Sequence, residues 1–341
     1  MNVINKIPGP LLIFMGALSL SFGGLIVKKF EGSTEWQILF WRSLFFTLTV
    51  LAFLIITYRK KTLSSFYKSG LPGFFGGIVL SFGFCGYVYA MSNTSVANTN
   101  FIISLQILFL AIFGYLFLKE KISTITLVSI ILAITGVTLM VGNDLRPGNL
   151  SGNLAAFTMP ITFAVLIMIV RKFPTVDMIP AQFVAGVSSC LIGLSVCIYY
   201  SHNLMVSPND IFLGFLAGFF QVGFGFIFIT IGARSTPSAM VGVIMLSESV
   251  LGPFWAFLFA GERASLFTLI GGAIILFAVL LQFSSSLLSD KKEKIINWLW
   301  HTSGRLFFHT GETTNYRSAE GATTQESLRQ KDRNILTLER D

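Results

Sequence analysis

Long apolar runs separated by short polar joints dominate the chain between residues 10 and 288. A helix needs about 20 apolar residues to cross the ~30 Å hydrocarbon core of a bilayer. The runs that reach this length lie at 10–27, 36–57, 71–91, 98–118, 124–142, 152–170, 181–200, 211–232, 238–260 and 266–288. Charged residues fill the joints, as in Lys119-Glu120-Lys121 and Arg171-Lys172. The pattern predicts an all-α integral membrane protein with ten transmembrane helices.

Composition divides the chain into two parts. Of the 341 residues, 53% are apolar and only 12% are charged, whereas soluble domains have ~25% charged residues. Residues 1–289 hold 15 of the 24 basic and 8 of the 16 acidic residues, and residues 290–341 hold all the others. We therefore expect a membrane body followed by a polar cytoplasmic tail, which begins at 295–308 with the apolar and cationic pattern of a surface-lying helix.

Basic side chains predict the orientation. If the N-terminus is cytoplasmic, the inner joints carry ten Lys and Arg residues and the outer joints carry four. Cytoplasmic loops are enriched in Lys and Arg, so we expect both termini in the cytoplasm and the protein in a cell membrane, the inner membrane of a bacterium. The net charge of +8 fits loops facing anionic lipid. No RNA- or DNA-binding motif accompanies it, so the expected partner is the bilayer and not nucleic acid.

The chain contains an internal repeat. A shift of 142 residues places Phe82-Gly83-Phe84 on Phe224-Gly225-Phe226 without a gap. The repeat predicts one five-helix domain at 1–146 and a second at 147–289. Because five is odd, the second copy enters the membrane upside down, which is the inverted-repeat design of secondary transporters with a site near the midplane. Chance similarity between apolar helices is the alternative.

Short segments in both halves carry a specific resemblance. The second half has Leu-Ser-Glu-Ser-Val-Leu-Gly-Pro at 246–253 and Gly-Glu-Arg at 261–263. The first half has Ser-Leu-Gln at 104–106 and Leu-Lys-Glu-Lys at 118–121, and Arg42 lies in the second span. Together these segments resemble the signature segments of the EamA family, which belongs to the drug/metabolite transporter superfamily.

The resemblance covers residues 10–288 and implies a ten-helix carrier with both termini in the cytoplasm. The family moves amino acids, nucleotide-like compounds and drugs, so the resemblance selects no single substrate. Three features depart from the family pattern. Lys119 stands where Gly is common, Ser249 stands where Pro is common, and the tail has no counterpart.

Glu248 is the one acidic residue deep inside a predicted span. A carboxylate there costs at least ~2.5 kcal/mol on insertion scales, so it should face a wet cavity or a partner. We expect it to carry a proton or to bind a cationic group of the substrate. A hydrogen-bonded structural Glu between helices is the alternative. Its repeat equivalent, Gln106, keeps the size and polarity without the charge.

Three other charged residues lie inside or beside the spans. Arg42 could contact an anion or pair with Glu248, but the favoured interpretation is an anchor that caps carbonyls or reaches the interface. Glu120 and its repeat equivalent Glu262 precede the fifth and tenth spans, where a carboxylate can cap a helix N-terminus. A gating ion pair with a nearby Lys or Arg is the alternative for both.

Glycines and prolines recur in both halves. Small residues spaced by two helical turns lie on one face, so a glycine seam is expected between the third and eighth spans, where the halves could rock. These glycines are Gly76 with Gly83, and Gly218 with Gly225. Pro160 and Pro253 should interrupt the sixth and ninth spans, either lining the site or only kinking the helices.

The predicted substrate site combines polar and aromatic residues of the spans. Asn and Gln side chains are costly in hydrocarbon unless they are hydrogen-bonded, so several should line one cavity. The residues expected at the site are Glu248, Gln106, Tyr87, Asn98, Gln221, Ser247, Trp255 and Ser19. For each aromatic residue, packing against lipid or another helix is the alternative.

Catalytic and cofactor motifs are missing from the sequence. The three His lie outside the deep parts of the spans, and there is no H-E-x-x-H, P-loop or C-x-x-C, so we predict no enzyme activity, no cofactor and no metal site. The predicted function is secondary transport of small organic metabolites such as amino acids, with proton coupling as an option, and the resemblance to the EamA family implies export. The alternatives are a non-transporting membrane scaffold or sensor, and a channel, against which the charged midplane argues.

Overall fold

The structure is a computed structural model that describes residues 7–27, 29–94, 96–141, 150–260, 266–267, 269–282 and 284. All of them lie in one compact unit, residues 1–288, and their regular structure is helical. The helices are α1 (Gly9–Leu20), α2 (Gly23–Val27), α3 (Glu35–Tyr58), η2 (Arg59–Lys61), α4 (Thr62–Asn93), α5 (Val96–Ser104), α6 (Gln106–Leu118), α7 (Thr124–Val141), α8 (Leu150–Ala156), α9 (Thr158–Lys172), α10 (Ile179–Tyr199), α11 (Pro208–Phe215), the π-helix η3 (Leu216–Phe224), α12 (Gly225–Ala233), α13 (Ser238–Met245) and α14 (Ser247–Ala260), followed by Leu269–Gln282.

These helices follow the predicted spans in chain order. The stretches long and apolar enough to cross a membrane are Gly9–Val27, Glu35–Asn93, Leu150–Lys172, Ile179–Tyr199 and Pro208–Ala233. Shorter apolar helices are Ile102–Leu118, Thr124–Leu139, Ser238–Gly252 and Leu269–Gln282. The prediction of an all-α integral membrane fold is confirmed, and ten spans are consistent with these segments.

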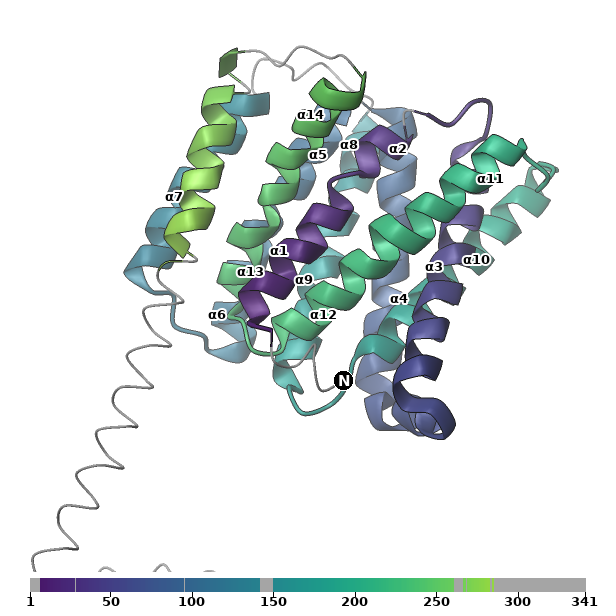
Figure 1. Ribbon diagram of the computed structural model, residues 1–341, viewed down its shortest axis with the longest axis horizontal. Helices are drawn as coiled ribbons and strands as arrows, with labels where there is room; N and C mark the ends of the chain where they lie inside the picture. The colour runs from purple at the N-terminus through teal and green to yellow at the C-terminus, as the bar shows by residue number, and fades with distance from the viewer. Residues whose placement is uncertain are drawn as a thin grey trace, which may run out of the picture. The chain divides into compact units, whose positions relative to one another are not determined.

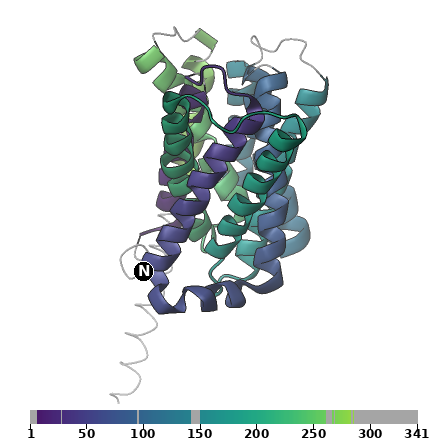
Figure 2. The same ribbon diagram turned by 90° about the vertical axis from the view of Figure 1, so that its right-hand side faces the viewer.

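The most extensive helix packing joins the two halves of the sequence. α3 packs against α10, α1 against α12, α4 against α9, and α6 against α13. Interchanging the two repeats exchanges the α1–α12 and α4–α9 pairs and maps the α3–α10 pair onto itself. The α6–α13 pair joins the fourth and ninth spans, which are repeat equivalents of each other. Figure 1 shows α1 beside α12, and Figure 2 shows the indigo α3 beside the teal α10. The repeat in sequence is therefore a repeat in packing, and the halves interleave.

The fourth and ninth spans break at equivalent places. α5 gives way to α6 at Leu105, and α13 gives way to α14 at Leu246. At both breaks a backbone hydrogen bond spans three residues instead of the four of an α-helix. Leu105 N donates to Ile102 O (3.1 Å), and Leu246 N donates to Val243 O (3.2 Å). Each break creates a new helix N-terminus in the interior of a span.

Prolines explain only part of this pattern. In the sixth span the break at Phe157 comes three residues before Pro160, whose ring and missing N–H disrupt the preceding turn. In the ninth span α14 continues through Pro253, and the break comes seven residues earlier. The prediction that Pro253 interrupts this span is therefore wrong in position.

The glycines of the third and eighth spans face other helices rather than each other. A Cβ on Gly77 of α4 would lie 2.5 Å from Ala181 O of α10. A Cβ on Gly225 would lie 2.9 Å from Leu20 Cδ2 of α1. The predicted seam between these two spans is therefore wrong, because each glycine row lets its helix approach a helix of the opposite half.

One end of the bundle is held together around Asp210, and we call it the Asp210 end. α11 begins here because Ser207 Oγ accepts the N–H of Asp210 (3.0 Å) and Pro208 occupies the first helical position. The Asp210 carboxylate accepts Glu31 N (3.1 Å) and Ser33 Oγ (2.5 Å). The loop between the first and second spans is thus fixed to α11.

Candidate functional site

Charged and aromatic side chains from three helices come together inside the bundle. Arg42 of α3 is 7% exposed, and its guanidinium carbon lies 5.1 Å from the ring centroid of Tyr87 and 5.5 Å from that of Phe84, both on α4. These distances are within the range of cation–π attraction. Glu248 of α14 lies close enough to Arg42 and Tyr87 to interact with both electrostatically. We call Arg42, Phe84, Tyr87 and Glu248 the central cluster.

The break in the ninth span places Glu248 at a helix N-terminus. α14 begins at Ser247, so Glu248 lies in its first turn, where the helix dipole favours a negative charge. Gln106 is the first residue of α6 after the equivalent break. Half-helices of this kind commonly line the sites of inverted-repeat transporters. This geometry explains how a carboxylate can be stabilised at this depth.

Trp255 and Gln221 lie at the break between α1 and α2. Trp255 Nε1 donates to Ser21 Oγ (2.9 Å), and the indole stacks on Phe22 with centroids 4.7 Å apart. Gln221 is buried, and its Nε2 donates to Leu20 O (3.4 Å). Both side chains satisfy polar groups near the end of α1. For Trp255, packing against another helix was the alternative interpretation.

The other predicted site residues differ in their placement. Ser247 is buried, and its hydroxyl donates to Ile244 O of the preceding turn (2.7 Å). Gln106 and Ser19 are also buried. The side chain of Asn98 lies outside the described residues. Of the seven predicted site residues whose side chains the structure describes, Tyr87 and Glu248 are the two that belong to the central cluster.

Sequence reasoning favoured the wrong interpretation of Arg42 and missed a pair of serines. The interpretation of Arg42 as an anchor reaching the interface is wrong, because the side chain is buried over the rings of Tyr87 and Phe84. The hydroxyl groups of Ser104 and Ser249 are 3.0 Å apart and link α5 to α14 beside the two breaks. The three-residue spacing of Phe84 and Tyr87 was a signal for one shared helix face.

Four phenylalanines form a packed layer next to the central cluster. They are Phe46 of α3, Phe84 of α4, Phe163 of α9 and Phe226 of α12, each at most 2% exposed. The ring centroids are 5.2 Å apart for Phe84–Phe226, 5.5 Å for Phe46–Phe84 and 6.0 Å for Phe163–Phe226, all in edge-to-face contact. We call these four residues the phenylalanine layer. Two of its helices come from each half.

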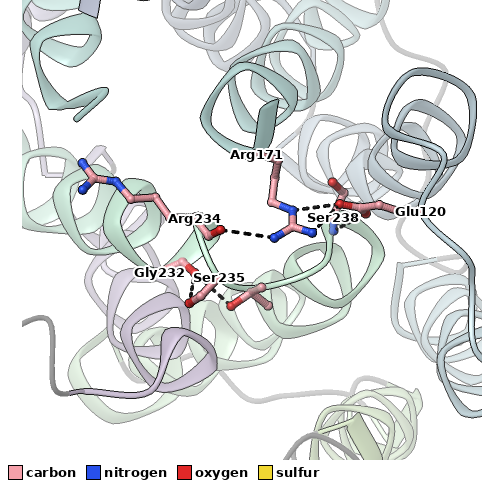
Figure 3. Close-up of polar contacts among 7 residues, drawn as sticks. Glu120, Arg171, Gly232, Arg234, Ser235 and Ser238 are labelled. Carbon is pink, nitrogen blue, oxygen red and sulfur yellow. Dashed lines mark hydrogen bonds and ion pairs between the residues drawn. The ribbon is translucent and has the colours of Figure 1, made fainter. Parts of the chain in front are cut away.

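Glu120 joins the two halves at the end of the bundle opposite Asp210. Its Oε1 accepts Arg171 Nε (2.8 Å), and its Oε2 accepts the backbone N–H of Ser238, the first residue of α13 (2.8 Å). Arg171 Nη1 also donates to Arg234 O (3.2 Å), and Figure 3 shows the guanidinium between these acceptors. The expectation that Glu120 caps the helix following it is therefore wrong. Glu262 lies outside the described residues.

A second ion pair completes this end. Asp177 pairs with Arg234, accepts the Tyr58 hydroxyl, and accepts Ile179 N (3.1 Å) at the start of α10. The charged side chains of the two pairs are 12–20% exposed. We call Tyr58, Glu120, Arg171, Asp177 and Arg234 the end network. It is separated from the Asp210 end by the 24 residues of α3, about 36 Å of helix.

The central cluster presents a guanidinium, a carboxylate and two aromatic faces at one depth. Such a set can bind a small molecule that carries both charges and an apolar part. In the described part of the chain, no group of three or more His, Cys, Asp or Glu side chains is placed to hold a metal ion.

The fold defines a helical membrane protein whose two halves repeat each other. The sequence profile of the EamA-like transporter family matches residues 7–142 and again residues 148–284. The chain therefore belongs to the EamA-like transporter family, as its signature segments predicted.

Two relatives with transporter names are similar to this chain, and a solved structure shares its fold. The chain is 23% identical over 209 residues to an uncharacterized transporter of Methanothermobacter thermautotrophicus, a match that spans 58% of this chain and 59% of that protein. It is 28% identical over 280 residues to human solute carrier family 35 member G1, spanning 77% and 75%. The crystal structure of another protein shares the fold with a TM-score of 0.70 at 17% identity, and the match covers 80% of this chain and 96% of that one.

Proposed function

We propose that the protein is a secondary transporter that exports small organic metabolites, such as amino acids or related compounds, by alternating access. The observation that carries this proposal is the central cluster, in which Arg42 and Glu248 come from opposite halves of an interleaved repeat. The activity is transport without a covalent step. The relation to a human solute carrier and to an uncharacterized transporter supports the same class of function.

The chemistry of the central cluster favours a zwitterionic substrate. Arg42 can donate to a carboxylate, and Glu248 can accept from an ammonium group. The rings of Tyr87 and Phe84, which already hold the guanidinium, offer an apolar face beside it. An α-amino acid with an apolar side chain would use all of these groups at once.

Proton coupling would follow from competition at Glu248. A carboxylate that binds either a proton or the substrate's ammonium group releases one when it takes the other. Its place in the first turn of α14 supports the charged form, and removal from bulk water opposes it. Opposing influences of this kind let a carboxylate change its protonation state during a transport cycle.

The proposed location is the inner membrane of a bacterium, with both termini and the end network on the cytoplasmic side. The excess of Lys and Arg on that side supports this orientation. Ser64 is exposed near the start of α4, close to Tyr58 at the end of α3. A Ser64→Cys variant should react with a membrane-impermeant maleimide in inside-out vesicles and stay unlabelled in intact cells. The opposite result would reverse the orientation.

Untargeted metabolite profiling of cells and medium tests the function. Cells with the protein should lose one or a few compounds to the medium, and cells with Glu248→Gln at equal membrane abundance should retain them. Uptake of those compounds by proteoliposomes then measures transport directly. A profile unchanged by the protein would favour a non-transporting scaffold or sensor and would overturn the proposal.

A further inference from the structure

The phenylalanine layer and the end network close one end of the bundle at two levels. Phe163 and Arg171 are eight residues apart on α9, and Phe226 and Arg234 are eight residues apart along α12 and its C-terminus. Eight residues of helix span about 12 Å. The layer shares Phe84 with the central cluster and extends from that cluster toward the end network.

Key bonds of the end network cross between the two sequence halves. Glu120 belongs to the first half, and both groups that it binds, the Arg171 guanidinium and the Ser238 N–H, belong to the second. The Tyr58 hydroxyl of the first half likewise donates a hydrogen bond to Asp177 of the second half. If the helices of the two halves separate at this end, these bonds must break. Bonds inside one half, such as Arg171 to Arg234 O, need not.

The Glu120 carboxylate serves two groups with its two oxygens. Oε1 takes the guanidinium and Oε2 takes the first N–H of α13, a helix that packs on α6 and α1. Loss of the negative charge would weaken both bonds together. The side chains of Arg171 and Glu120 are 20% and 15% exposed, so water can replace either partner at moderate cost, unlike in a fully buried pair.

We propose that Glu120 is the latch of a gate, which holds this end closed through Arg171 and the N-terminus of α13 and opens it when both bonds are released. The proposal rests on the proposed transport function and adds to it the device that controls access from this side. In the structure the latch is closed and the phenylalanine layer beneath it is packed. A transporter in this conformation exposes its central cluster to this side only after Glu120 is released.

Cys85 offers a native reporter at the depth of the central cluster. It lies on α4 directly after Phe84, and it is half-buried. A protein carrying Cys190→Ala and Cys197→Ala would keep this single thiol. Its reaction with a membrane-impermeant methanethiosulfonate reagent, applied to intact cells or to inside-out vesicles, measures access from each face separately.

Glu120→Gln should raise the labelling rate of Cys85 from the face that labels Ser64→Cys, by roughly threefold or more, without raising the rate from the other face. A two-state shift changes the two accessibilities in opposite directions. Arg171→Gln should do the same, and it carries the test if the first variant does not elute as a monodisperse species. Lys121→Gln is the matched control, because this exposed residue follows Glu120 in the same loop.

Two outcomes would overturn the latch: an unchanged rate from the Ser64 face, or a rate that rises from both faces, which indicates local loosening. The proposed function fails separately. If labelling shifts as expected but profiling finds no exported compound, the latch stands without transport. If transport is normal and labelling does not shift in either variant, the latch alone is refuted.

Discussion

The central cluster and the end network use the same charged groups in different ways. In the end network, Arg171 and Glu120 contact each other directly, with an N–O distance of 2.7 Å. In the central cluster, Arg42 rests on two ring faces, and within the described part of the chain it makes no direct ion pair with Glu248. Charges that are bonded to each other hold helices together. Charges held apart at the same depth remain available to a third molecule.

The surroundings explain why each arrangement is stable. A buried guanidinium over aromatic faces is stabilised by ~0.5–2 kcal/mol of cation–π attraction, even where no carboxylate contacts it. A carboxylate in the first turn of α14 gains from the helix dipole in the same way. At the partly exposed end, water lowers the cost of charge and a direct pair adds little beyond ~1 kcal/mol. The comparison predicts large functional effects at the centre and small stability effects at the end.

The largest effect should come from Glu248→Gln. Gln keeps the shape and is already accepted at the equivalent position as Gln106, so the fold should persist. It cannot carry a proton or pair with a cation, so net transport should fall roughly tenfold or more, since a charged hydrogen bond contributes about 1.5–3 kcal/mol. Substrate exchange should survive better than pH-driven flux if the group carries a proton. Proteoliposome flux measures both, with Glu35→Gln as the control acid.

The comparison would be contradicted if the Glu248→Gln protein transported like the unmodified protein across pH ~5.5 to 8, a range in which a desolvated carboxyl group can titrate. In that case the carboxylate at the N-terminus of α14 is structural.

Close packing between the helices that connect the two regions should give the next largest effect. A methyl group on Gly83 would collide with Thr162 Oγ1, and one on Gly225 would press on Leu20. Gly83→Ala and Gly225→Ala should each lower the free energy of unfolding by roughly 1–3 kcal/mol. Nothing lies within 4 Å of a methyl group on Gly24, so Gly24→Ala should be neutral. Thermal unfolding in detergent checks this, and equal losses at all three would remove the packing argument.

Arg42→Lys should have an intermediate effect on transport. Lysine keeps the charge but not the flat guanidinium that reaches both Tyr87 and Phe84. A loss of about 1 kcal/mol, or roughly fivefold in KM, is expected. Arg59→Lys, at an exposed position, is the control. An unchanged KM would place the substrate away from Arg42.

The smallest effect should come from Asp177→Asn. Asn keeps a hydrogen-bond acceptor for Tyr58 but loses the charge that pairs with Arg234. The free energy of unfolding should fall by about 0.5–1 kcal/mol at low salt, and the difference should shrink at high salt because of screening. Denaturation at two ionic strengths measures it. A loss as large as that of Gly83→Ala would show that the end network is a main source of stability.

Local patterns in the sequence predicted the class of fold. The length of an apolar run is a property of a single segment, so the spans could be placed without knowing their neighbours. The equivalence of 82–84 and 224–226 identified the repeat. The packed pairs α1–α12 and α4–α9, which correspond to each other under this repeat, reproduce it in the structure. Glu248 could be singled out because a charge deep in an apolar run is rare and costly.

The sequence by itself thus determined the spans, the repeat, the family and the one acid expected at the centre. Only the tertiary structure decided the partners: Arg42 over Tyr87, Glu120 with Arg171, and each glycine row with a helix of the other half. These contacts join positions 45 residues or more apart on helices whose rotation and breaks no single apolar run records. Whether a segment can span the membrane depends on that segment alone, whereas its contacts depend on how all the segments pack together.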